Sequence, residues 1–189
     1  MDTMADRAAP AAVRNCSASV ITRQVTLPSP IGPLTLIAAG GQLTGLYMDA
    51  QRHRPANETF GVEGDLADEP FASAARQLEA YFAGELTAFD LPLAPAGTPF
   101  QLRVWSALLT IPYGKTWSYA ELDRAVGSAS RPVGLANGKN PIALVIPCHR
   151  VIGSDGSLTG YGGGLDRKRF LLELEGSAAP SLVPVTPNH

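Results

Sequence analysis

The residues best suited to covalent chemistry lie in one short stretch, Pro147-Cys148-His149-Arg150, directly after the apolar run 141–146, which is predicted to be a strand. A cysteine is a strong nucleophile once its thiol loses a proton, and a nearby imidazole can accept that proton and stabilise the thiolate. A buried cysteine on an apolar strand is more often an inert small hydrophobic residue. Here two polar side chains follow Cys148 at once, and burying them is costly unless they have partners. The segment therefore indicates a reactive thiol at the mouth of a loop.

The spacing of Cys148 and His149 does not by itself bring the two side chains together. Neighbouring side chains on an extended strand point to opposite faces, so we expect a water molecule to relay the proton between them. A third group would have to orient the imidazole. On these residues alone, a hydrolase with a cysteine nucleophile, which would turn over repeatedly on an ester or amide, remains an alternative.

The composition is that of a globular protein with one ordinary domain or two small ones. The chain has 189 residues, 45% of them hydrophobic, and no apolar run approaches the roughly 18 residues that span a bilayer. Its Ala-rich start lacks the basic flank and apolar stretch of a secretion signal. Cys16 and Cys148 are the only cysteines, and a single disulfide is not expected in a reducing compartment. We therefore expect a cytoplasmic protein that does not engage membranes.

Charge is distributed unevenly along the chain. The net charge of -2 would by itself argue against a nucleic-acid partner, because phosphate binding needs a positive surface. Residues 1–91 contain 6 Lys and Arg against 11 Asp and Glu, whereas residues 92–189 contain 9 against 6. The balances are -5 and +3, so the second half is the candidate for an anionic partner, with modest and salt-sensitive affinity.

Short β-branched segments alternate with turn residues in the first part of the chain. Segments 19–26, 34–39 and 42–48 are separated by a Pro-Ile-Gly-Pro turn and by Gly40-Gly41, and they predict an antiparallel meander. From residue 68 to 83 the hydrophobic period becomes helical. The predicted apolar face of this helix consists of Phe71, Ala75, Leu78 and Phe82.

The second half is predicted to be more helical. Helices are expected over roughly 99–111 and 119–126, and a third runs from Ser128 or Ser130 to about Asn137. Two short helices joined by a Gly-containing turn favour a helix-turn-helix as much as an αα-hairpin inside a core, so both interpretations stay open here.

The chemistry-bearing residues, taken together, resemble those of the O6-alkylguanine-DNA alkyltransferases, also called methylated-DNA-protein-cysteine methyltransferases. The resemblance covers about 98–176, and the sequences of its motifs are closest to those of the bacterial single-function branch. Besides Pro147-Cys148-His149-Arg150, the matching motifs are Tyr113-Gly114, Ser118-Tyr119, Asn137-Gly138-Lys139-Asn140-Pro141, Gly160-Tyr161-Gly162-Gly163-Gly164 and Leu174-Glu175-Gly176.

The resemblance implies an α+β fold of two small domains. A ribonuclease H-like α/β domain is expected over 19–91, where this chain is similar to the family only in layout. A linker at 92–98 would lead to a mostly helical, winged-helix-like domain over 99–176 that contains a helix-turn-helix. Disordered tails are predicted at 1–18 and 177–189.

The resemblance also assigns catalytic roles. It makes Cys148 the alkyl acceptor, His149 its base through a water, and Glu175 the carboxylate that orients the imidazole. Tyr119 would protonate the leaving guanine near N3, and Asn140 would brace the turn that holds the cysteine. The implied reaction moves a methyl group irreversibly from O6-methylguanine, and also from O4-methylthymine, to Cys148 once per molecule and without a cofactor.

The implied partner is double-stranded DNA containing O6-alkylguanine, bound through the minor groove by a monomer that can assemble cooperatively. A stacked base is out of reach, so the target nucleotide must be flipped out of the duplex. The resemblance assigns the intercalating finger to Arg131, although Pro132 follows it where the family commonly has alanine. The small or apolar residues expected to approach the groove, together with Asn137, are Val133, Gly134 and Ala136.

The resemblance implies that the flipped base contacts the glycine-rich loop. Tyr161 would pack on the guanine, the N–H of Gly162 would contact O6, and the carbonyls of Cys148 and Val151 would bind the exocyclic amine. The alternative of a phosphate-binding P-loop at 160–164 is disfavoured, because the lysine and serine of that motif are missing.

Two further alternatives concern the activity of the protein and its metal content. One is a binder of damaged DNA similar to the alkyltransferase-like proteins, which keep the scaffold but replace the cysteine; here Cys148 is present. The other is a structural zinc in the first half, as some relatives have. That half offers only Cys16 and an isolated His53, so no metal is expected.

Overall fold

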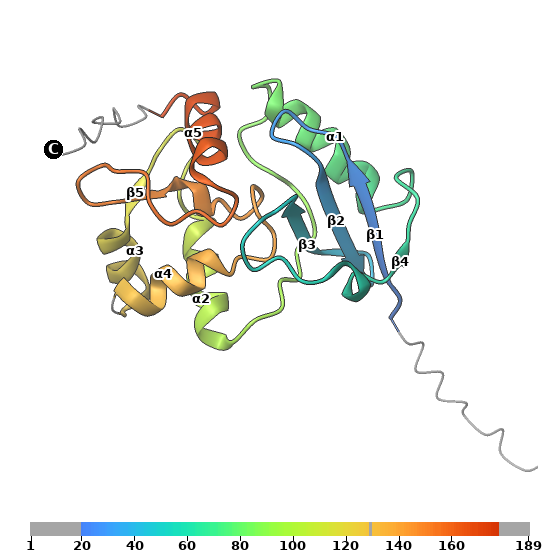
Figure 1. Cartoon of the computed structure of the whole chain (residues 1–189), viewed down its shortest axis with the longest axis horizontal. Coiled ribbons are helices and arrows are strands. Elements are labelled where there is room, and N and C mark those ends of the chain that lie inside the picture. The colour runs from blue at the N-terminus through green and yellow to red at the C-terminus, as the bar shows by residue number, and fades with distance from the viewer. Residues whose placement is uncertain (1–19, 129, 178–189) are drawn as a thin grey trace, which may run out of the picture.

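The first half of the chain forms a four-stranded sheet covered by one helix (Figure 1). The computed structural model describes residues 20–128 and 130–177. The sheet has the strand order β3-β2-β1-β4, with antiparallel pairs except for β4, which runs parallel to β1. The elements are β1 (Thr22–Leu27), β2 (Leu34–Ala39), β3 (Gln42–Met48), the 3-10 turn η1 (Asn57–Thr59), β4 (Val62–Glu63) and α1 (Phe71–Phe82).

The predicted meander is confirmed, and its second and third strands have the predicted bounds. Side chains of β2 alternate between two apolar clusters, as the period of a strand requires. Leu34, Leu36 and Ala38 join the main core with α1, whereas Ile37 packs with two aromatic residues on the other face. The short strand β4 was not predicted, because its two residues are exposed and carry no hydrophobic pattern.

Helix α1 begins at Phe71, three residues later than predicted. Pro70 precedes it, and the residue before a proline is disfavoured in the helical conformation, so the helix cannot extend back through Glu69. The predicted apolar face is also corrected: Tyr81 is buried and Phe82 is only half-buried. The buried face consists of Phe71, Ala74, Leu78 and Tyr81, at the 3,4,3 spacing of a helix stripe.

The second half contains the helices that the caps predict. Thr98 and Ser118 each form a complete capping box with the Gln or Glu three residues on, and Gly127 ends α3 in the left-handed conformation. The strands β5 and β6 pair in parallel. The elements are α2 (Pro99–Leu108), β5 (Trp117–Ser118), α3 (Tyr119–Val126), α4 (Ser130–Gly138), the 3-10 turn η2 (Cys148–Arg150), β6 (Val151–Ile152) and α5 (Leu165–Leu174).

Helices α3 and α4 pack against each other and against α2 (Figure 1). The indole N–H of Trp105 in α2 donates to the carbonyl of Ala136 at 2.9 Å, and this bond ties the C-terminal part of α4 to α2. Arg131 and Leu135 on the outer face of α4 are exposed. The second helix of this pair therefore has one face open to solvent.

The segment before Cys148 is not the predicted strand. Residues 141–147 fold as turns, with one isolated bridge between Ile142 and Leu46. The side chain of Asn140 accepts from the N–H of Ile142 and donates to the carbonyl of Ile146, which curls the chain. Prolines 141 and 147 lack the N–H groups that a ladder needs. Apolar content alone misled the prediction, because a buried turn is as apolar as a buried strand.

The two halves share one continuous hydrophobic core. The stretch predicted as a linker at 92–98 passes along β3, where Leu43 exchanges backbone hydrogen bonds with Pro92 and Ala94. Ser177 is buried and bonded to the carbonyl of Leu172, so the ordered chain extends into the segment predicted as a C-terminal tail. The predicted tail 1–18, with Cys16, lies outside the described residues, as do residues 178–189.

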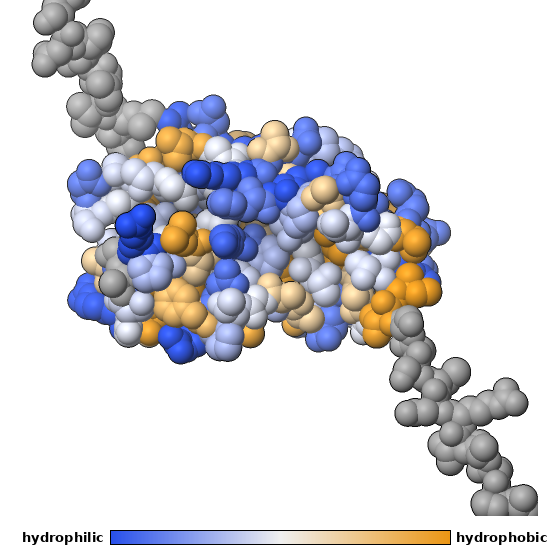
Figure 2. All heavy atoms as spheres, turned by 60° about the horizontal axis from the view of Figure 1, so that its bottom comes forward, coloured by the Kyte–Doolittle hydropathy of each residue, from blue (hydrophilic) through white to orange (hydrophobic). Residues whose placement is uncertain are grey.

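The surface carries no large segregated apolar face in the view of Figure 2, where polar and apolar residues are interspersed. None of the helices in 20–128 and 130–177 is long and apolar enough to cross a membrane.

Candidate active site

Cys148 opens the 3-10 turn η2 and is 6% exposed. Burial raises the pKa of its thiol, and hydrogen bonding by Asn140 and the charge of Lys168 oppose that rise only in part. The resting residue is therefore a protonated thiol. Reaction at Sγ requires a group that removes the proton when substrate arrives.

His149 and Glu175 form the buried pair that this role needs. The distance from His149 Nε2 to Glu175 Oε1 is 2.7 Å, and both side chains are fully buried. Burial would raise the pKa of Glu175, but hydrogen bonds from His149, Arg150 and Tyr81 lower it to about 2. Burial lowers the pKa of His149, which the bond to Glu175 offsets only partly. Glu175 is thus ionised and His149 neutral at neutral pH.

The charge on Glu175 fixes the tautomer of the imidazole. An ionised carboxylate accepts only, so His149 donates Nε2–H to it and leaves Nδ1 as an unprotonated acceptor. Nδ1 is buried and has no hydrogen-bond partner. Because Cys148 and His149 lie in a 3-10 turn, the predicted alternation of a strand does not apply to them. The free Nδ1 remains the natural recipient of the thiol proton.

Two residues that hold Glu175 were missed as site residues. Arg150 donates from Nε to Oε2 at 2.8 Å and from Nη2 to Oε1 at 3.0 Å. Tyr81 of α1 donates its hydroxyl to Oε1 at 2.7 Å, across 94 residues of sequence. The only available signal was physical: a buried tyrosine needs a partner for its hydroxyl.

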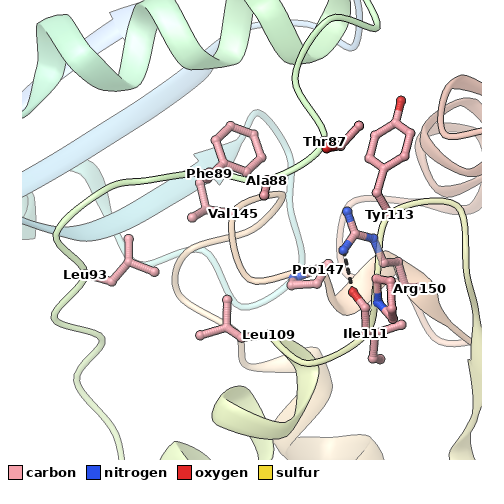
Figure 3. Close-up of a pocket in the computed structure, with 11 residues that line it drawn as sticks. Thr87, Ala88, Phe89, Leu93, Leu109, Ile111, Tyr113, Val145, Pro147 and Arg150 are labelled. Atoms are coloured by element: carbon pink, nitrogen blue, oxygen red, sulfur yellow. Dashed lines mark hydrogen bonds between the residues drawn. The ribbon is translucent and has the colours of Figure 1, made fainter.

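A large hollow beside this network is not the reactive site. It has a volume of about 530 Å³ and lies between residues 87–93 and the turn that carries Pro147 and Arg150. Figure 3 shows Arg150 turned toward Ile111, to whose carbonyl it donates at 2.6 Å, with Tyr113 alongside. Cys148 does not line this hollow.

The cavity at Cys148 is far smaller, about 10 Å³, which is room for about one water molecule. The loop 160–164 and Asn137 line it, and the same loop borders a neighbouring hollow of about 390 Å³. Tyr161 in this loop has a buried hydroxyl without a partner. The loop therefore separates the larger hollow from the small cavity that contains the thiol of Cys148.

Three other predicted site residues, the catalytic Tyr119 and the pocket residues Gly162 and Val151, lie in or near this loop. The hydroxyl of Tyr119 is 3.4 Å from the carbonyl of Gly160. The carbonyl of Gly162 accepts from the backbone N–H of Arg52, so the loop docks on the first half of the chain. The carbonyl of Val151 accepts from Lys168 Nζ at 2.5 Å. Lys168 was also missed; it is fully buried, and burial lowers its pKa to about 8.

The residues of α4 that were predicted to contact DNA differ in their burial. Val133, Ala136 and Asn137 point into the protein and are at most 3% exposed, so their side chains do not reach the outer surface. Arg131 is exposed and Gly134 half-buried on the outer face, as a groove contact requires. The prediction took residues that are close in the sequence of α4 and did not consider which face of the helix each one occupies. Among the described residues, no three His, Cys, Asp or Glu side chains come together as a metal site.

Comparison with known proteins places this site in a family. Residues 99–177 match the model of the 6-O-methylguanine DNA methyltransferase DNA binding domain, and residues 23–95 match that of its ribonuclease-like domain. The chain therefore belongs to the 6-O-methylguanine DNA methyltransferase family, and the predicted family and α+β class are confirmed.

Individual relatives narrow the comparison. The methylated-DNA–protein-cysteine methyltransferase of Mycobacterium tuberculosis H37Rv is 56% identical over 158 residues, which cover 82% of this chain and 93% of that protein. The Mycobacterium leprae protein of the same name is 55% identical over 152 residues, 79% and 90% of the two chains. The crystal structure of M. tuberculosis OGT in complex with DNA superposes with a TM-score of 0.75 at 56% identity, covering 84% of this chain and 95% of that one.

Proposed function

We propose that this protein repairs alkylated DNA by moving a methyl group from O6 of guanine directly and stoichiometrically to Sγ of Cys148. The observation that carries the proposal is the buried hydrogen-bonded pair of neutral His149 and ionised Glu175, which directly follows the buried thiol of Cys148. Relatives at 55–56% identity that are named methylated-DNA–protein-cysteine methyltransferases support it.

Access of the base requires two movements. The lesion must leave the duplex, at a cost of about a few kcal/mol that is smallest for a poorly paired base. Arg131, exposed at the start of α4, would fill the gap from the minor groove. The loop 160–164 must then open, because a cavity of about 10 Å³ cannot hold a purine. Its glycines give the backbone the freedom for such a movement.

Proton removal precedes attack. His149 Nδ1 accepts the proton of Cys148, directly or through one water, and the resulting imidazolium is stabilised by the carboxylate of Glu175 at 2.7 Å. Arg150 and Tyr81 hold that carboxylate in place. The thiol of Cys148 is thus ionised only while His149 holds its proton.

The transfer itself is a displacement at a saturated carbon. The Sγ–CH₃ bond forms while the CH₃–O6 bond breaks, and the electron pair passes to the purine, which takes a proton at N3 from Tyr119. The product is a thioether, which has no easy hydrolytic route, so each molecule acts once. O4-methylthymine presents the same methyl–oxygen bond and is the second substrate.

We expect the protein to act on DNA as a monomer. We assign residues 99–176 to DNA binding and alkyl acceptance, 19–91 to a scaffold that supplies Tyr81, and 92–98 to the connection between them. Minor-groove contact would come from the exposed face of α4. The cytoplasmic location expected from the sequence is part of this proposal.

A mass measurement tests the proposal. After exposure to DNA containing O6-methylguanine, the peptide with Cys148 should gain the mass of one methyl group, and Cys148→Ala should gain none. A methyl group on another residue, or none on Cys148, contradicts the assignment. Release of methanol with an unmodified protein would indicate the cysteine hydrolase instead.

A further inference from the structure

The first half of the chain forms part of the wall of the cavity at Cys148. Met48, the last residue of β3, and Gln51 line this cavity together with the loop 160–164. The loop packs closely against them, because a Cβ added to Gly163 would lie only 2.7 Å from Sδ of Met48. The position of the loop relative to the first half therefore sets the space beside the thiol.

One side chain, that of Arg167 in α5, joins the loop to the first half. Its Nε donates to the carbonyl of Ile31 at 2.9 Å, and its Nη1 donates to the carbonyls of Asp49 at 2.7 Å and Gly163 at 3.3 Å. Ile31 lies before β2 and Asp49 directly follows β3, and these two strand ends are paired in the sheet. The guanidinium therefore holds the backbone of the loop against one end of the sheet.

The acceptors of Arg167 are neutral backbone carbonyls. Within residues 20–128 and 130–177, no carboxylate forms an ion pair with this guanidinium. A guanidinium carries its donors in a rigid planar fork, so its hydrogen bonds fix direction as well as distance. A loop that moves away from the first half must therefore break the bond between Arg167 and Gly163.

The ends of the loop are held on the side of the second half by the next residue of α5, Lys168. Its buried Nζ donates to the carbonyl of Thr159 at 2.7 Å, directly before the loop. Its backbone N–H donates to the carbonyl of Gly164 at 3.1 Å, at the end of the loop. Because both ends are tied to one side chain, we expect the cavity to enlarge through movement of residues 161–163, where Arg167 binds.

We propose that Arg167 is a specificity-determining residue of the alkyl transfer: by binding the loop 160–164 to the first half of the chain, it limits the size of the alkyl group that reaches Cys148. The inference rests on the proposed function, in which this loop opens to admit the flipped base. O6-methylguanine needs the smallest opening, whereas a bulkier group such as benzyl needs one that breaks the bond to Gly163. The bond therefore slows the reaction of large adducts more than that of methyl adducts.

The test compares single-turnover rates on one DNA duplex that carries either O6-methylguanine or O6-benzylguanine. The ratio of the benzyl rate to the methyl rate should be about tenfold higher in Arg167→Met than in the wild type, as expected for the loss of one hydrogen bond from a charged donor. Arg167→Lys has a single ammonium in place of the planar fork and should show a smaller rise. It carries the comparison if the methionine variant does not fold.

Arg169→Met is the matched control on the same helix. The side chain of Arg169 lies 3.9 Å from the carboxylate of the exposed Asp166 and forms no bond to the loop. This variant should keep the wild-type ratio of the two rates.

Hydrogen exchange supplies a readout of the loop itself. The backbone N–H of Arg52 donates to the carbonyl of Gly162 at 2.7 Å, so its exchange reports whether the loop is docked on the first half. In Arg167→Met this amide should exchange faster, while the amides of β2 should keep their wild-type protection. Wild-type exchange at Arg52, or equal acceleration in β2, would overturn the role of Arg167 as a specific tie.

The rates also separate the inference from the function on which it rests. An unchanged ratio in Arg167→Met and Arg167→Lys, or an equal fall of both rates, overturns the role of Arg167 and leaves methyl transfer to Cys148 intact. A wild-type protein that gains no alkyl group from either duplex overturns the proposed function itself.

Discussion

Replacing Glu175 by glutamine gives the sharpest physical test of the buried network. The carboxylate accepts hydrogen bonds from Tyr81 and His149 at 2.7 Å each and from Arg150 at 2.8 and 3.0 Å. The variant keeps the shape and removes the charge, which leaves the guanidinium of Arg150 buried without its counter-ion. Breaking a buried pair in this way typically costs about 3–5 kcal/mol.

The pKa of Glu175 gives a second measure of the same interaction. It falls from 4.5 to about 2 in the folded protein. At roughly 1.4 kcal/mol per pH unit this corresponds to about 3 kcal/mol, in agreement with the lower end of that range. Because the folded pKa is lowered, the contribution is complete above about pH 4.5 and is lost as the pH falls from 4.5 toward 2.

Urea unfolding of the wild type and Glu175→Gln, from neutral pH down to about pH 3, measures this contribution. The variant should be about 3 kcal/mol less stable at neutral pH, and the difference should shrink at the acid end as the wild type loses its charge. Glu173→Gln, an exposed position on α5, is the control and should show no such difference. The reasoning would be refuted if the wild type and Glu175→Gln were equally stable at neutral pH, or if the difference in their free energies of unfolding stayed constant down to about pH 3.

Three further changes test other parts of the site. Tyr81→Phe removes one donor to Glu175 and should lower stability by about 1 kcal/mol in urea unfolding, with slower methyl transfer; unchanged kinetics would show that Tyr81 does not position the relay. Gly160→Ala places a Cβ 2.8 Å from the Tyr119 hydroxyl, at a φ of +64° that alanine rarely adopts. The rate of methyl transfer, measured by rapid quench, should therefore fall. A variant that reacts at the wild-type rate would show that the loop adapts to the added methyl group. Arg131→Ala should slow repair of duplex DNA more than repair of a single-stranded oligonucleotide, and equal effects on both would exclude a role in base flipping.

Features with local causes could be predicted from the sequence. The caps at Thr98 and Ser118 and the glycine at 127 act within one turn of their helices, and both helices begin where the caps predict, although α2 ends at Leu108 rather than near residue 111. The meander followed from β-branched segments separated by turn residues. The reactive stretch at Cys148 stood out because two polar residues end an apolar run.

Features with distant causes could not be predicted. Tyr81 reaches Glu175 across 94 residues, and no local pattern encodes that contact. The turns of 141–147 depend on the side chain of Asn140, whose brace is visible only in three dimensions. Asn137 looked like a surface residue because the phase of α4 against the core is set by packing, which buries that side chain.

The number of bases repaired by each protein molecule tests the central claim most directly. Wild-type protein should be mixed with an excess of DNA containing O6-methylguanine, and restored guanine and methylated Cys148 should be counted together over time. The account predicts that both plateau at one per molecule of active protein and that the two counts agree. Continued restoration beyond one, or restoration without a methyl group on Cys148, would contradict it.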